Sequence, residues 1–207
     1  LTSPVSIGNI VVGKYLALVT VYLIPLLVIC LYPLIMAKYG TVSFPMAYTA
    51  ILGFAFLGFA EIAVGVFLSS LTENPVIAAV LCFLTLFVCF MIDGIKSLIS
   101  DTSSTSLVIY MVLILAAVLL FYNMIRNALI AGIVGLIGEI AVIAAYLIDS
   151  TMFESSVKDF LSIFDITGHF DNFTNGILDL QGLVYFLSII VIFVFLTVQS
   201  MKKRRWS

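Results

Sequence analysis

The stretch GVFLSSLTENPVIAAVLCF, residues Gly65–Phe83, decides how this chain folds. It consists of two apolar runs joined by the short polar turn SSLTENP, residues 69–75. Asn74 is of a residue type that caps helix N-termini, and Pro75 suits the first helical position, where its missing N–H would have no intrahelical partner. The stretch therefore predicts that one long apolar helix ends at this turn and that another begins directly after it.

The composition of the chain places these helices in a membrane. The 207 residues are 63% hydrophobic and 10% charged, with a mean hydropathy of +1.29. Soluble domains average about 45–50% apolar and about 25% charged residues. The net charge of −2 provides no basic field for nucleic acid, and the three cysteines stand singly in apolar runs, so neither nucleic-acid binding nor a metal site is expected. We therefore expect an all-α, polytopic transmembrane helical bundle.

Further apolar runs divide the chain into about six spans, most of them near the roughly 20 residues needed to cross a bilayer. They cover residues 15–37, 47–71, 75–92, 107–122, 128–148 and 182–200. Residues 149–181 differ in kind, because apolar side chains recur there at helical spacing among polar ones. The two stripes are Val157, Phe160, Leu161 and Phe164, then Phe170, Phe173, Ile177 and Leu180. They predict short amphipathic helices on the outer side of the membrane.

The distribution of basic residues predicts the orientation. Six spans place both ends of the sequence on the same side, and cytoplasmic segments carry an excess of Lys and Arg. With the ends inside, six of the nine basic residues are cytoplasmic. These are Lys14, Arg126, Lys202, Lys203, Arg204 and Arg205. The turn at residues 69–75 is then cytoplasmic as well.

Two acidic residues, Glu61 and Glu139, fall inside apolar spans. A carboxylate facing lipid is costly, so an intramembrane acid suggests a proton relay or a contact with a cationic substrate. Gly58 and Gly65 share a helical face with Glu61, and Gly132 and Gly135 share one with Glu139. Small residues allow close helix packing. The alternative is therefore a neutral or hydrogen-bonded acid that only fixes how helices pack.

Several short motifs together resemble the ABC type 2 permeases, and within them the branch that includes gliding-motility permeases. At the start, LTSPVS (residues 1–6) precedes Gly13-Lys14, and GVFLSSLTEN (65–74) covers the end of the second span and the turn after it. Near the end come HFDNF (169–173), GILDL (176–180), YFLS (185–188) and FLTV (195–198). Taken in order, these motifs cover most of the chain. The resemblance therefore implies a single transmembrane permease domain, residues 1–207.

This resemblance implies the membrane subunit of an ATP-driven exporter in the bacterial cytoplasmic membrane, moving an unidentified substrate. Such a subunit is not an enzyme and needs no cofactor of its own, because ATP and Mg²⁺ bind a separate ABC ATPase subunit. It pairs with a second permease copy or a homologue. Residues 1–14 match part of a cytoplasmic coupling segment, and the turn at residues 69–75 is a second contact. The implied ATPase-coupling residues are Leu1, Thr2, Ser3, Pro4, Val5, Ser6, Gly13, Lys14, Thr72, Glu73 and Asn74.

The chain departs from this family pattern in two places. The family has two further spans before the segment that matches residues 1–14, and its shorter members lack the pair of spans at 107–148. Glu61 also stands where such proteins carry an apolar or aromatic residue. Two alternatives therefore stay open. One is an ion- or proton-coupled secondary transporter that uses Glu61 and Glu139, and the other is a membrane anchor without transport activity.

Overall fold

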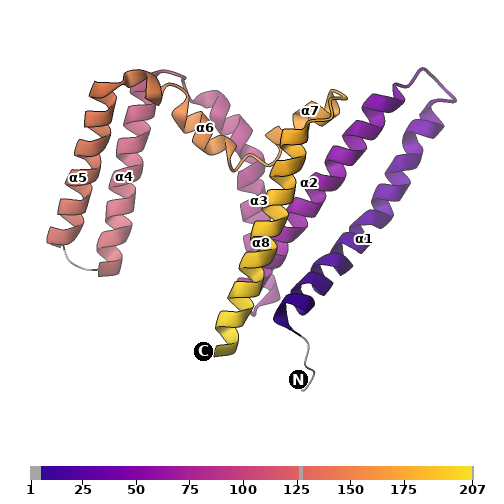
Figure 1. Ribbon diagram of the computed structural model, residues 1–207, viewed down its shortest axis with the longest axis horizontal. Coiled ribbons are helices and arrows are strands. Elements are labelled where there is room, and N and C mark those ends of the chain that lie inside the picture. Colours follow the sequence, from indigo (N-terminus) through magenta and orange to yellow (C-terminus); the bar gives the residue numbers. More distant parts are fainter. Residues whose placement is uncertain (1–5, 126–127, 207) are drawn as a thin grey trace. The chain divides into compact units, whose positions relative to one another are not determined.

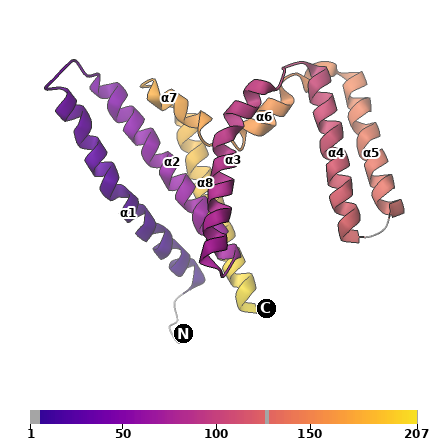
Figure 2. The same ribbon diagram turned by 180° about the vertical axis from the view of Figure 1, so that it is seen from behind.

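The computed structural model describes residues 6–125 and 128–206, and in these ranges the chain contains helices and connecting turns but no strand (Figures 1 and 2). The α-helices are α1 Ile7–Met36, α2 Phe44–Leu71, α3 Pro75–Leu98, α4 Ser103–Ile125, α5 Ala128–Ile148, α6 Ser156–Ser162, α7 Asp171–Thr174 and α8 Leu180–Trp206. Two short 3-10 turns are η1 Ser150–Phe153 and η2 Gly168–Phe170. The all-helical prediction is confirmed for the described residues.

Local capping explains the α2–α3 junction. Helix α2 ends at Leu71, after which Thr72 is extended, with φ −131° and ψ 152°. The Asn74 side-chain oxygen accepts hydrogen bonds from the backbone N–H groups of Val76, at 2.9 Å, and Ile77, at 3.5 Å. Pro75 is the first residue of α3. The predicted abrupt junction between two apolar helices is therefore confirmed, with Asn74 as its cap.

Helix α1 begins earlier than the span predicted from residue 15. The Ser6 hydroxyl accepts a hydrogen bond from the backbone N–H of Asn9 at 3.2 Å and so caps a helix of 30 residues. Residues 7–14 are thus the first turns of the same helix rather than a separate segment. Val11, in this part, is buried, which shows that packing extends the helix beyond its most apolar run.

Four described helices are long and apolar enough to cross a membrane. They are Ile7–Met36, Phe44–Leu71, Pro75–Leu98 and the Leu180–Lys203 part of α8. A fifth span is counted if Gly132–Ile148 and Ser150–Ser162, which are bent by 117°, form one broken span. Helix α4 qualifies only as a shorter apolar helix over Ser103–Leu119. The described residues are therefore consistent with a multi-pass membrane protein of four to five spans, and the predicted number of about six is not confirmed.

Contacts divide the chain into two compact units. Unit 1 comprises residues 1–90 and 166–207, and unit 2 comprises residues 91–165. In unit 1, α2 lies between α1 and α8 (Figure 1). Its core joins Leu57 and Ala60 of α2 to Phe173 and Phe186. A β-carbon at Gly53 would lie 2.5 Å from the Phe173 side chain, so only glycine lets this ring sit directly against α2.

Unit 2 is built on the antiparallel pair α4 and α5, which lie side by side in both views (Figures 1 and 2). A β-carbon at Gly135 of α5 would lie 2.9 Å from the Val118 side chain of α4. Above this pair, Phe153 of η1 makes edge-on ring contacts with Tyr110 and Tyr146. The small residue therefore permits close helix packing, and an aromatic cluster closes one end of the hairpin.

The segment between α5 and α8 forms shorter helices than its apolar stripes predict. Val157 in α6 and Phe173 in α7 are buried, as expected for an apolar face. However, the stripe from Phe170 to Leu180 does not form one helix. Helix α7 ends at Thr174, and Gly176 adopts φ +79°, a left-handed conformation that interrupts the helix. Leu180 instead starts α8 and is 75% exposed.

Candidate functional site

One end of unit 1 brings together three segments that are far apart in the sequence. These are the first turns of α1, the turn between α2 and α3, and the last turns of α8 (Figure 1). A cavity of about 740 Å³ lies among them. Its wall includes Val11 and Lys14 of α1, Ser70 of α2 and Met201 of α8. The start of α1 and the end of α8 therefore line the same cavity. This cavity, named the basal cavity below, is the candidate functional site.

The inner wall of the basal cavity is apolar. It is formed by Leu18, Val21 and Pro25 of α1 together with Ile62 and Val66 of α2. These side chains come from helices that are apolar around their whole circumference, as expected for membrane spans. The inner part of the cavity is therefore chemically closer to the hydrocarbon of a bilayer than to an aqueous pocket.

Three of the hydroxyl groups in the wall donate to the backbone of their own or a neighbouring helix. Ser70 Oγ donates to the Phe67 carbonyl at 2.6 Å, and Thr197 Oγ1 donates to the Phe193 carbonyl at 2.7 Å. Tyr22 Oη donates across to the carbonyl of Phe54 on α2 at 2.9 Å. Because each of these hydroxyl hydrogens is already donated to a backbone carbonyl, the three groups can offer a ligand only their acceptor lone pairs. Among the described residues that line the cavity, Lys14 alone is charged.

The predicted coupling residues fall into three groups. Leu1, Thr2, Ser3, Pro4 and Val5 lie outside the described residues. Ser6 caps α1, Gly13 lies on α1, and Lys14 one position later reaches the basal cavity. In the turn, the Thr72 hydroxyl accepts a hydrogen bond from the Asn74 backbone N–H at 3.2 Å, so both residues shape the turn. Glu73 lies between them. Of the basic residues, Arg126 and the side chains of Arg204 and Arg205 lie outside the described residues.

Glu61 lies on α2 and is half-buried. Tyr22 covers Gly58, where a β-carbon would be 2.3 Å from the ring. Gly65 meets α3 instead, because Cys82 Sγ lies 3.5 Å from its carbonyl oxygen. Gly58 therefore permits a close helix contact, whereas at Gly65 the nearest atom to a β-carbon would be 4.0 Å away.

Glu139 lies on α5 and is half-buried in unit 2. Its neighbours Gly135 and Gly138 face α4, with positions for a β-carbon 2.9 Å from Val118 and 3.3 Å from Ile114. Gly132 has no atom within 4 Å of its β-carbon position, so it adds no contact. Glu61 belongs to unit 1 and Glu139 to unit 2.

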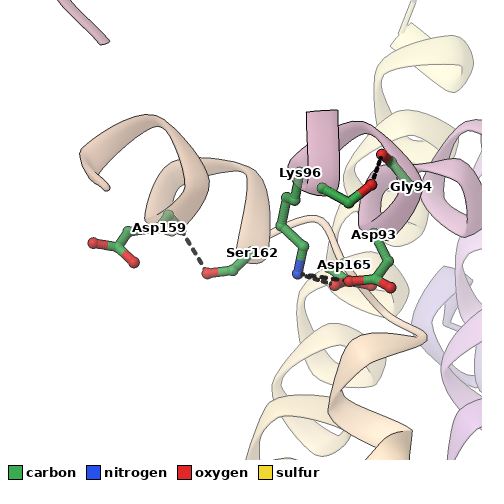
Figure 3. A network of polar contacts seen from close by, with 7 residues as sticks. Asp93, Gly94, Lys96, Asp159, Ser162 and Asp165 are labelled. Carbon is green, nitrogen blue, oxygen red and sulfur yellow. Dashed lines mark hydrogen bonds and ion pairs between the residues drawn. The ribbon is translucent and has the colours of Figure 1, made fainter. Parts of the chain in front are cut away.

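Unit 2 contains an ion pair that the sequence does not predict. Lys96, near the end of α3, forms an ion pair and hydrogen bond with Asp165, whose side chain is 1% exposed (Figure 3). Asp93, one helical turn earlier, lies 3.4 Å from the same ammonium group. The two partners are 69 positions apart, and no periodicity in the sequence connects them. The pair attaches the end of α3 to the segment that follows α6.

A second ion pair lies in the same unit on its surface. Lys158 of α6 approaches Asp101 to 2.7 Å, and Ser155 Oγ donates to Asp101 at 3.2 Å. The Lys158 hydrogen bond holds the pKa of the Asp101 carboxyl below its usual range. A polar cleft of about 360 Å³ is lined by Lys158 and, among others, by Asp93 and Lys96. Both lysines in its wall therefore already have carboxylate partners.

Comparisons with known proteins do not assign a function to the chain. No family model, curated protein or solved structure matches the chain. The resemblance to ABC type 2 permeases thus stands on the short motifs alone. Within the described residues, no group of three or more His, Cys, Asp or Glu side chains is placed to hold a metal ion.

Proposed function

We propose that this chain is the membrane permease subunit of an ATP-binding-cassette exporter, driven by a separate ATPase subunit. The observation that carries the proposal is the common location of the two implied coupling segments. Lys14 of the first segment and Ser69 and Ser70 beside the turn line the same basal cavity. A single soluble partner docked at this end of unit 1 could therefore contact both segments at once.

The charges at this end support a cytoplasmic location. Lys14 lies there, and Lys202 and Lys203 directly follow Met201, which lines the basal cavity. Excess Lys and Arg mark the cytoplasmic side of a membrane protein. A cytoplasmic ATPase would then have access to α1, to the α2–α3 turn and to the end of α8. Its ATP-driven movements would act on three helices of one packed unit.

The decisive experiment is reconstitution with the ATPase. The tagged chain would be purified from native membranes, an ATPase subunit would be identified among its partners, and both would be reconstituted in liposomes. The permease should stimulate ATP hydrolysis. Glu73→Lys combined with Asn74→Ala should weaken this stimulation more than it weakens membrane insertion. Asn74→Asp is the matched control, because aspartate also caps helices and should retain the turn.

A proton- or ion-coupled transporter is the second candidate, and the half-buried acid Glu61 within the apolar helix α2 favours it. The two proposals differ in their energy source. If transport continues without ATP and is abolished by Glu61→Gln and Glu139→Gln, the exporter proposal is wrong. If transport requires the ATPase and both glutamine variants remain active, the acids only fix helix packing.

A further inference from the structure

The basal cavity is polar at one end and apolar along its depth. Lys14 lines it near the start of α1, and Ser69 and Ser70 line it near the end of α2. Further along α1, at one-turn intervals from Lys14, come Leu18, Val21 and Pro25. The wall thus changes from charged to apolar along the direction of α1, which is the direction in which a membrane changes from headgroups to hydrocarbon.

The size and chemistry of the cavity favour an apolar occupant. Its volume of about 740 Å³ lies within the range of about 300–1,000 Å³ typical of small-molecule sites. A water-soluble ligand would need polar partners at depth. The hydroxyls of Tyr22, Ser70 and Thr197 already donate to backbone carbonyls, so they offer a ligand acceptor lone pairs but no donor. A hydrocarbon chain needs no such partner and matches the aliphatic side chains of the inner wall.

The charge at the polar end favours an anionic headgroup. Lys14 is the one charged side chain among the described lining residues, and Lys202 and Lys203 follow the lining residue Met201. Glu73 is the one carboxylate of the neighbouring turn. Three ammonium groups against one carboxylate give this end a positive potential. Basic residues at the ends of spans attract anionic lipids in this way.

We propose that the basal cavity binds an anionic membrane lipid, with one acyl chain between α1 and α2 and the headgroup phosphate paired with Lys14. The long aliphatic stem of lysine allows its ammonium group to reach the headgroup region while the stem covers apolar surface. The second acyl chain stays in the surrounding bilayer. This proposal requires only that unit 1 lies in a membrane, and it is independent of the ATPase.

Photolabelling in vesicles tests the site. The full chain is reconstituted with phosphatidylglycerol that carries a diazirine in one acyl chain, or with phosphatidylcholine that carries the same chain, and labelled peptides are identified by mass spectrometry. We expect label on peptides that contain Leu18 and Val66. Labelling should be about fivefold stronger with phosphatidylglycerol, the ratio that corresponds to about 1 kcal/mol for one basic residue near anionic lipid.

Matched variants separate headgroup and chain recognition. Lys14→Glu should remove the preference for phosphatidylglycerol, whereas Lys38→Glu, in the exposed turn after α1, should retain it. Val66→Trp should fill the cavity and reduce labelling there at least about fivefold, a loss of about 1 kcal/mol. Val191→Trp places the same bulk on a 67% exposed position of α8 and should leave labelling unchanged.

Three results would overturn the proposal. One is equal labelling by both lipids that Lys14→Glu does not alter. Another is labelling at Val66 that survives Val66→Trp in folded protein. The third is absence of label together with dimers in native mass spectrometry that Val66→Trp disrupts, because a second copy of the chain would then occupy the cavity. If Val66→Trp fails to fold, the comparison of Lys14→Glu with Lys38→Glu still decides the headgroup claim.

Discussion

The ion pair between Lys96 and Asp165 provides the strongest test of how unit 2 is held together. In Asp165→Asn the side chain keeps its size but loses its charge. Asp165 is 1% exposed and Lys96 is 20% exposed, so the lysine would keep an unpaired charge with only partial access to water. Asp93, 3.4 Å away and 69% exposed, remains as a weaker partner. Breaking a buried ion pair by removing one partner costs about 3–5 kcal/mol.

Because Asp93 compensates part of the charge, we expect a loss at the lower end of that range, about 3 kcal/mol. This corresponds to roughly a hundredfold change in the unfolding equilibrium. The matched control is Lys158→Met, which removes the surface pair with Asp101. Asp101 is 68% exposed, and exposed pairs contribute about 0–1 kcal/mol. The assay is equilibrium unfolding of the purified protein in detergent micelles titrated with SDS, followed by circular dichroism.

A double variant tests whether the stranded charge is the cause. Lys96→Met combined with Asp165→Leu removes both charges and supplies apolar groups, a replacement that is often neutral or stabilising. We expect this variant to unfold within about 1 kcal/mol of the parent protein. If it is destabilised as much as Asp165→Asn, the cost does not arise from an unpaired ammonium group. If Asp165→Asn and Lys158→Met cost the same, Asp165 does not hold α3 in place.

Two further predictions concern packing and pH. Gly53→Ala should destabilise the protein by about 1–3 kcal/mol, because the new β-carbon would lie 2.5 Å from the Phe173 side chain. The control is Gly94→Ala, where no atom lies within 4 Å of the β-carbon position and the change should be neutral or stabilising. Thermal unfolding of both variants measures the difference. The Lys158 hydrogen bond lowers the pKa of Asp101 below its usual 3.8. The ion pair therefore stabilises the protein above pH 3.8, and this stabilisation is lost as the pH falls through the lowered pKa. Asp101→Asn should reduce the loss of stability at acid pH, and acid unfolding titrations in which the variant and the parent protein behave alike would contradict this prediction.

Local chemistry could be predicted from the sequence, but long-range pairing could not. The α2–α3 turn follows from Asn74 and Pro75, because caps act within a few residues. The predicted first span begins at residue 15, after the charged Lys14, whereas helix α1 extends back to its serine cap at residue 6. The ion pair of Lys96 with Asp165 depends on how distant segments fold together. The division into two units is likewise a property of contacts and leaves no compositional signal.

Lys14 near the start of α1 and Met201 near the end of α8 line the same cavity, so these two segments lie at the same end of unit 1. Residues 14 and 201 are far apart in the sequence. Like the ion pair of Lys96 with Asp165, this juxtaposition therefore depends on how distant segments fold together.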